Sequence, residues 1–111
     1  MFAFSRSRSS GPIQTTAAEL QARLARGERP AIIDVRTPEE YAFGHIPGAR
    51  LMPLDRLPQM ARSLHPDEEI VLVCRSGNRS MQAYRFLERL GYRQLRNLDG
   101  GMLDWTGPVA R

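Results

Sequence analysis

The sequence predicts an α/β fold built on a parallel sheet. Short apolar runs rich in β-branched residues alternate along the chain with segments whose apolar residues recur at helical spacing. The predicted strand 69–74 is apolar throughout after its first residue, as a strand buried on both faces of a parallel sheet requires. The length of 111 residues and a hydrophobic content of 41% favour one globular domain, which we predict over residues 12–111.

The first predicted elements are a helix and a strand. Thr16 and Glu19 have the spacing of a capping box, in which each side chain satisfies a backbone N–H of the other residue. Gly27 can close this helix in the left-handed region. Residues 31–35 are short, apolar and β-branched, and they predict a strand.

A second short helix, a short strand and a further helix follow. Thr37 is the expected cap of the short helix and Pro38 lies in its first turn, whereas Gly44 begins the interruption that ends it. Residues 49–52 predict a short strand, and apolar residues at helical spacing predict a helix over residues 55–64.

The last third of the chain repeats the strand–helix–strand pattern. The strand 69–74 is followed by a polar loop over residues 75–78, a helix over residues 79–90 and a last strand over residues 94–98. A short helix containing Trp105 is expected at the end.

Composition excludes several kinds of chemistry. The chain contains sixteen basic residues, all arginine, with one cysteine, two histidines and a net charge of +4. Without lysine there is no Schiff-base chemistry and no phosphate-loop lysine. One cysteine forms neither an internal disulfide nor a four-cysteine zinc site, so we expect no metal. The charge favours small anionic partners, and no recognised nucleic-acid-binding motif is present.

Residues 1–11 are predicted to form a disordered tail, because serine and arginine alternate there. These residues lack the apolar region of a secretory signal, and no stretch approaches the roughly 18 apolar residues of a membrane span. Together with the unpaired cysteine, these features favour a cytoplasmic protein that does not bind membranes. We expect a monomer.

The only cysteine lies where the strongest strand ends and a polar loop begins. In open parallel sheets, ligands bind outside the carboxyl ends of the strands. Gly77 lets the loop curl into an anion-binding nest of backbone N–H groups, and the following helix adds its amino-terminal partial charge. Arg75 and Arg79 add two permanent charges, and Ser80 can donate a hydrogen bond into the loop. The surroundings therefore favour the thiolate of Cys74 and an anionic substrate.

Each of these residues also has a plain structural interpretation. A free cysteine at a strand end is most often a small buried hydrophobe, and Arg79 on a helix is most often a solvated side chain. Their conjunction with a glycine-bearing loop between a buried strand and a helix favours a reactive thiolate.

This loop resembles the active-site loop of the rhodanese family, the thiosulfate sulfurtransferases, whose pattern is Cys-Arg-x-Gly-x-Arg. Two further stretches agree with the family, in the right order, and the resemblance as a whole runs from about Thr15 to Trp105. The amino-terminal signature corresponds to Asp34-Val35-Arg36-Thr37-Pro38-Glu39-Glu40-Tyr41 with Gly44-His45-Ile46-Pro47-Gly48-Ala49, and the carboxyl-terminal one to Leu98-Asp99-Gly100-Gly101 with Trp105.

The resemblance implies a central parallel sheet of about five strands, flanked by helices on both faces. It also implies a double-displacement reaction that requires no cofactor. Cys74 would take the outer sulfur of a donor such as thiosulfate as a persulfide and pass it to cyanide or to a thiol. Because the chain has no second cysteine, that thiol would belong to another molecule. The residues that would bind substrate and stabilise the thiolate or persulfide are Arg75, Ser76, Gly77, Asn78, Arg79 and Ser80.

Two other functions stay open. Phosphatase and arsenate reductase relatives have five residues between the cysteine and the arginine, whereas four separate Cys74 from Arg79. The shorter loop makes a smaller cradle, suited to sulfur. A non-catalytic or relay module would instead bind a partner protein through the face that carries the loop.

The remaining motif residues are given supporting roles. Asp34 is expected to orient Arg36 or the loop amides, and Arg36 either contributes to the field of the site or pairs with Glu39 or Glu40. Structural roles are expected for three other features: a turn-fixing hydrogen bond for His45, close backbone approach at Gly100 and Gly101, and core packing for Trp105.

Overall fold

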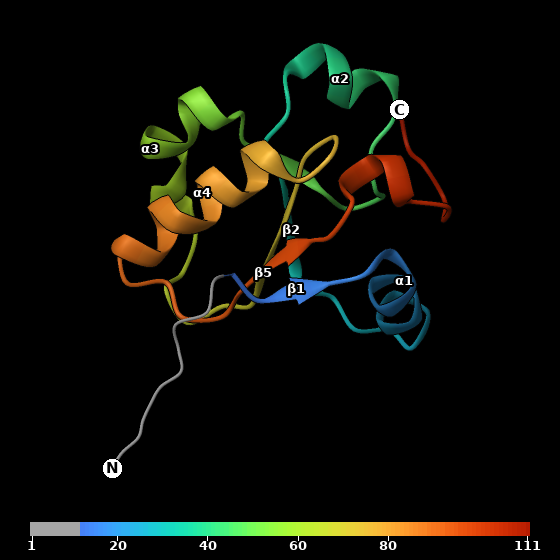
Figure 1. Ribbon diagram of the computed structural model, residues 1–111, viewed down its shortest axis with the longest axis horizontal. Helices are drawn as coiled ribbons and strands as arrows, with labels where there is room; N and C mark the ends of the chain where they lie inside the picture. Colours follow the sequence, from blue (N-terminus) through green and yellow to red (C-terminus); the bar gives the residue numbers. More distant parts are fainter. Residues whose placement is uncertain (1–11) are drawn as a thin grey trace.

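The centre of the molecule is a sheet of five parallel strands in the order β1-β5-β4-β2-β3 (Figure 1). This computed structural model describes residues 12–111, so the disordered tail predicted over residues 1–11 lies outside the described residues. The predicted α/β fold, with about five parallel strands and helices on both faces, is confirmed. The strands are β1 (Gln14–Thr15), β2 (Ala31–Asp34), β3 (Arg50–Leu51), β4 (Ile70–Val73) and β5 (Leu95–Leu98).

Helices cover both faces of this sheet. On one side α3 and α4 pack against the strands, and on the other side α1 and a short 3₁₀ helix, η4, do so. The helical elements are α1 (Ala17–Ala25), α2 (Pro38–Phe43), η2 (Leu54–Arg56), α3 (Leu57–Met60), η3 (Ala61–Ser63), α4 (Asn78–Arg89) and η4 (Gly101–Asp104). Within residues 12–111, no helix has the length and apolar character needed to cross a membrane.

The two cores arise from the alternation of side chains along the buried strands. Successive residues of a strand point to opposite faces of a sheet. Ile33 and Leu72 therefore join the core beneath α3 and α4, whereas Ile32 and Val71 join the core beneath α1. Because both faces are covered, every residue of β4 is buried.

The predicted capping box at α1 is present, and the predicted cap of α2, Thr37, forms a second capping box with Glu40. The Glu19 N–H donates to Thr16 Oγ1 at 3.1 Å, and the Thr16 N–H donates to Glu19 Oε1 at 2.8 Å. At α2 the corresponding distances between Thr37 and Glu40 are 3.2 and 3.0 Å. These side chains satisfy backbone donors that the first turn of a helix leaves without partners.

The structure corrects two element predictions. The strand β1 was not predicted, because its two residues are too few to show any periodicity. The predicted helix over residues 55–64 is broken into η2, α3 and η3. Pro58 lies at the start of α3 and has no N–H to donate, which limits regular α-helical bonding in this segment.

Gly101 holds η4 against the loop that follows β4. The Met102 N–H donates to the Cys74 carbonyl at 2.9 Å, and the Leu103 N–H donates to the Arg75 carbonyl at 3.0 Å. At Gly101 φ is +56°, and a Cβ would lie 2.4 Å from the Cys74 carbonyl oxygen. The predicted close backbone approach at Gly101 is therefore confirmed.

We expect Gly101→Ala to destabilise the protein by about 3 kcal/mol or more, because backbone strain and a backbone clash coincide there. Gly48→Ala is the matched control: its φ is +88°, but nothing lies within 4 Å of the added Cβ. The free energy of unfolding of that control should fall by only about 1 kcal/mol. Urea denaturation of the two variants measures the difference, and equal losses would contradict the packing described here.

Candidate active site

The predicted reactive loop lies at the carboxyl end of the central strand. β4 ends at Val73, Cys74 follows directly, and α4 begins at Asn78, one residue earlier than predicted. β2 and β5 flank β4 in the sheet, so the ends of these two strands border the loop on either side (Figure 1). The topology thus brings all three sequence motifs to one end of the molecule.

Cys74 is the floor of this loop. Its residue is 1% exposed and belongs to the core beneath α4. Gly77 has a φ of +120° and caps α4, and its backbone N–H donates to Cys74 Sγ at 2.9 Å. Ser80 Oγ lies 3.3 Å from the same sulfur. Burial alone would suit an inert cysteine, whereas polar hydrogens aimed at the sulfur suit a sulfur that carries charge.

The pKa of Cys74 reflects two opposing effects. Burial raises the pKa of the thiol, because it removes water from the charged form. Hydrogen bonds from the Ser80 side chain and from the backbone at Ser80, Gly77 and Ser76 act in the other direction and prevail, so that the pKa lies below its ordinary value. The loop therefore favours the thiolate, which is the nucleophilic form of cysteine.

Ser80 connects the sulfur to a residue that the sequence analysis missed. The Ser80 hydroxyl lies 3.1 Å from the Gly77 carbonyl oxygen and 2.5 Å from Asn97 Oδ1. Asn97 is 2% exposed and lies on β5. One feature of the sequence pointed to Asn97: it lies two residues after Leu95 on the predicted strand, so its polar side chain faces the same side of the sheet as that buried leucine, directly before the carboxyl-terminal motif.

Arg79 does not point freely into the site, and it is not a solvated helix residue either. Its guanidinium donates to both carboxylate oxygens of Glu40, at 2.7 and 2.8 Å. Both side chains are about seven-tenths buried. Glu40 thus caps α2 through Thr37 and fixes the cation beside the loop, a role that the sequence analysis did not assign to it.

This ion pair predicts a pH dependence of stability. Hydrogen bonds from Arg79 hold the pKa of Glu40 at about 2, against an ordinary value of 4.5, although partial burial opposes the shift. A carboxyl with a depressed pKa stabilises the fold above its ordinary pKa, and this contribution is lost as the pH falls toward the folded-state value. Glu40→Gln should therefore lower the free energy of unfolding by about 1 kcal/mol at neutral pH. The difference in unfolding free energy between variant and wild type should shrink as the pH falls from 4.5 to about 2.

Urea denaturation across this pH range measures the effect. Glutamine can still complete the capping box, so the comparison isolates the charge. Glu39→Gln is the matched control, because Glu39 is exposed and no ion pair of the described residues includes it. A pH-independent difference for Glu40→Gln would contradict the assignment.

Asp34 and Arg36 form a buried pair beside the loop. Arg36 Nη2 donates to Asp34 Oδ2 at 2.7 Å and to the Gly44 carbonyl at 2.8 Å. The expected orientation of Arg36 by Asp34 is therefore observed. Pairing of Arg36 with Glu39 or Glu40 was wrong, because the Arg36 side chain folds back onto β2 while Glu40 holds Arg79.

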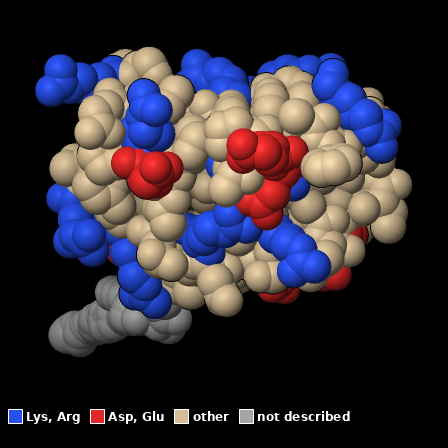
Figure 2. All heavy atoms as spheres, turned by 90° about the horizontal axis from the view of Figure 1, so that it is seen from above, with Lys and Arg blue, Asp and Glu red and all other residues tan. Residues whose placement is uncertain are grey.

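The outer wall of the loop is polar and open. Arg75, Ser76 and Asn78 are exposed. Among the ion pairs of residues 12–111, none includes Arg75. Figure 2 views the molecule from the side on which α2 lies, and arginine surfaces lie around carboxylates on this face. Arg75 is thus a cation that can meet an incoming anion, whereas Arg79 is shared with Glu40.

His45 fixes a turn, as expected. Its Nδ1 lies 2.8 Å from the Tyr41 carbonyl oxygen, and its ring stacks on that of Tyr41 at 3.6 Å. Its backbone also pairs with Ala110 in an antiparallel bridge. These contacts hold the segment that follows α2.

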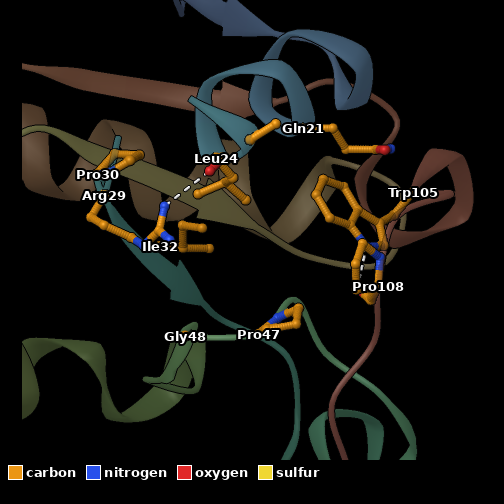
Figure 3. Close-up of a pocket in the computed structure, with 10 residues that line it drawn as sticks. Gln21, Leu24, Arg29, Pro30, Ile32, Pro47, Gly48, Trp105 and Pro108 are labelled. Carbon is orange, nitrogen blue, oxygen red and sulfur yellow. Dashed lines mark hydrogen bonds between the residues drawn. The ribbon is translucent and has the colours of Figure 1, made fainter. Parts of the chain in front are cut away.

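A cavity of about 780 Å³ opens on the α1 face of the sheet and contains none of the loop residues. Figure 3 shows Leu24 and Ile32 on one side of this cavity and Trp105 and Pro108 on the other. Trp105 is buried, as expected, and its Nε1 donates to the Pro108 carbonyl at 2.9 Å. The wall is thus mainly apolar and structural, and the nucleophile lies elsewhere.

Comparison with known proteins agrees with this geometry. The family described as Rhodanese-like domain matches residues 16–108. A sulfurtransferase of Allochromatium vinosum is 41% identical over 87 residues, which cover 78% of this chain and 81% of the relative. The thiosulfate sulfurtransferase GlpE of Pseudomonas fluorescens is 32% identical, with 77% of this chain and 78% of the relative covered. The crystal structure of a rhodanese-like domain protein from Staphylococcus aureus superposes with a TM-score of 0.80 at 37% identity, covering 85% of this chain and 91% of the other.

Proposed function

The chain belongs to the rhodanese-like domain family, whose relatives include sulfurtransferases, and from this premise we propose that it is a thiosulfate sulfurtransferase. It moves a sulfane sulfur from thiosulfate, or a related donor, to an external acceptor through a persulfide on Cys74. One observation carries the proposal: the Gly77 N–H donates to the Cys74 sulfur at 2.9 Å inside the loop that begins α4.

The first half-reaction uses the thiolate that the loop favours. Cys74 Sγ attacks the outer sulfur of thiosulfate, and the sulfur–sulfur bond of the donor breaks. Sulfite leaves with the bonding electron pair, and Cys74 retains the outer sulfur as a persulfide anion. Arg75 meets the sulfonate from the exposed side, while Arg79 contributes positive charge from its position beside Glu40. No proton has to be removed once Cys74 is ionised.

The second half-reaction returns the enzyme to its starting state. A nucleophilic acceptor, cyanide or a thiolate, attacks the outer persulfide sulfur, and the bond to Sγ breaks. Cys74 keeps the electron pair and becomes a thiolate again, while the acceptor leaves as thiocyanate or as a persulfide. The loop amides that stabilise the thiolate also face the persulfide anion. Because Cys74 is the only cysteine, the thiol acceptor is a separate molecule.

The loop length favours sulfur over phosphate. Four residues lie between Cys74 and Arg79, and the Gly77 amide is already bonded to the sulfur at 2.9 Å. This cradle suits one charged sulfur atom better than a phosphoryl group with three oxygens. A reducing compartment suits an unpaired thiol nucleophile, so the proposal places the enzyme in the cytoplasm. The proposal also includes a monomeric state and small anionic substrates.

Turnover on two substrates tests the proposal. We expect thiocyanate formation from thiosulfate and cyanide, and no release of phosphate from an aryl phosphate. Aryl phosphate hydrolysis without thiocyanate formation would replace the proposal with a phosphatase. Persulfide formation without turnover to small acceptors would make the chain a relay that delivers sulfur to a partner protein.

A further inference from the structure

A chain of hydrogen bonds leads from the Cys74 sulfur across three elements of the fold. Ser80 Oγ lies 3.3 Å from Cys74 Sγ and 2.5 Å from Asn97 Oδ1, and Asn97 Nδ2 donates to Gln14 Oε1 at 2.8 Å. Ser80 is 0% exposed and Asn97 is 2% exposed. Water is therefore largely excluded from Ser80 and Asn97, and their polar groups must find hydrogen-bond partners in each other and in their neighbours.

The number of hydrogens in this chain limits its arrangements. A serine hydroxyl has one hydrogen to donate, a thiol can donate its own, and a thiolate only accepts. With Cys74 as a thiol, the S–H can donate to Ser80, and Ser80 can donate to Asn97 Oδ1 at 2.5 Å, which is nearer than its other acceptor, the Gly77 carbonyl at 3.1 Å. When Cys74 ionises, Ser80 must turn its hydrogen toward the sulfur, and Ser80 Oγ and Asn97 Oδ1 would then face each other as two acceptors.

We propose that Asn97 is a positioning residue whose side-chain amide turns over when Cys74 ionises. After half a turn, Asn97 Nδ2 donates to Ser80 Oγ, and Ser80 donates to the thiolate. Asn97 Oδ1 then faces Gln14, whose amide can turn in the same way and donate from Nε2. Gln14 Nε2 is available for this, because its present contact is a weak one of 3.8 Å to the Met81 sulfur.

The role of this switch in sulfur transfer rests on the proposed function, because the persulfide, like the thiolate, is an anion that only accepts. The hydrogen-bond switch itself requires only the ionisation of Cys74. The charged groups on the elements around the loop are Asp34 at the end of β2, Arg36 just after it, Glu40 on α2, Arg75 in the loop, Arg79 on α4 and Asp104 on η4; among them, Asp34 pairs with Arg36 and Glu40 pairs with Arg79.

Nuclear magnetic resonance of the wild-type protein tests the switch without changing Asn97. The side-chain amide signals of Asn97 should shift with pH at the same midpoint as the ionisation of Cys74, followed separately by the rate of alkylation with iodoacetamide. The same signals should not move over that range in Cys74→Ala. Asn97 signals that stay constant while Cys74 ionises in the wild type would overturn the proposal.

Two variants test whether Asn97 acts through Ser80. Asn97→Leu keeps the branched shape of the side chain but can neither accept from nor donate to Ser80. The bond that Asn97 would donate supports a charge-assisted bond to the thiolate, which is worth more than the neutral bond lost in the thiol state, so the substitution should raise the pKa of Cys74 by about one pH unit. In a Ser80→Ala background, Asn97→Leu should raise it no further, because the connection to the sulfur is already lost. Equal rises in both backgrounds would show that Asn97 does not act through Ser80 and would overturn the proposal.

Thr15→Val is the matched control, because Thr15 is also a buried polar residue and lies on β1, beside β5. It makes no contact with Ser80 among the hydrogen bonds of the described residues, so it should leave alkylation of Cys74 unchanged. No sulfur donor is present in any of these measurements. Failure of the switch and failure of sulfur transfer are therefore distinguishable, and if Asn97→Leu does not fold, the wild-type titration decides.

Discussion

Replacing Cys74 by serine is expected to abolish thiocyanate formation from thiosulfate and cyanide. The serine hydroxyl can still accept from the Gly77 N–H, which donates to Sγ at 2.9 Å in the wild type. However, a hydroxyl does not ionise near neutral pH, and without an anionic nucleophile the first half-reaction does not begin. Steady-state thiocyanate production by purified wild type and variant measures the loss, which should be complete.

Stability provides the control for this substitution. The two side chains have the same shape and similar partners, so the urea midpoint of Cys74→Ser should lie close to that of the wild type. A correctly folded variant that retained turnover would place the nucleophile elsewhere. Since Cys74 is the only cysteine of the chain, no other thiol can account for residual activity.

Removing the Arg79 guanidinium should give the second-largest loss. Arg79→Ala is expected to lower kcat/KM for thiosulfate by about 10- to 100-fold, the effect of losing one charge-assisted interaction with an anion. Steady-state kinetics measure the change. Arg89→Ala is the matched control: Arg89 lies at the other end of the same helix, is exposed, and belongs to none of the ion pairs of residues 12–111.

The ion pair with Glu40 makes a further comparison necessary. In Arg79→Ala the Glu40 carboxylate loses its partner and adds a negative charge near the thiolate. Arg79→Ala combined with Glu40→Gln removes that charge, so any activity it recovers measures the repulsion, and the remaining loss measures the direct contribution of Arg79. Wild-type kcat/KM in the single variant would contradict the role given to Arg79.

Much of the fold could be predicted because its signals are local. The continuous apolar run before Cys74 indicates a doubly buried strand, and the two Thr–Glu capping boxes mark helix starts within four residues of sequence. Each of the four predicted strands matches its observed bounds to within one residue at either end. The position of Cys74 followed from the same local reasoning, since a loop after a central parallel strand must lie at the edge where ligands bind.

The unpredicted features depend on contacts between distant residues. Glu40 reaches Arg79 across 39 positions, and Ser80 reaches Asn97 across 17. Neither separation along the sequence follows from a helical or strand repeat. The sequence therefore shows that these residues are polar without showing which partner each one contacts. The partner nevertheless determines the chemistry: Arg79 is a cation shared with a carboxylate, and Asn97 is a buried amide behind the nucleophile.

The central claim is that Cys74 carries sulfur as a persulfide, and intact-mass spectrometry tests it most directly. Wild-type protein incubated with thiosulfate should gain the mass of one sulfur atom, lose it again on addition of cyanide, and show no gain in Cys74→Ser. Alkylation of a separate sample verifies that Cys74 is a free thiol before the incubation. An unchanged wild-type mass after incubation of such protein with thiosulfate would contradict the account.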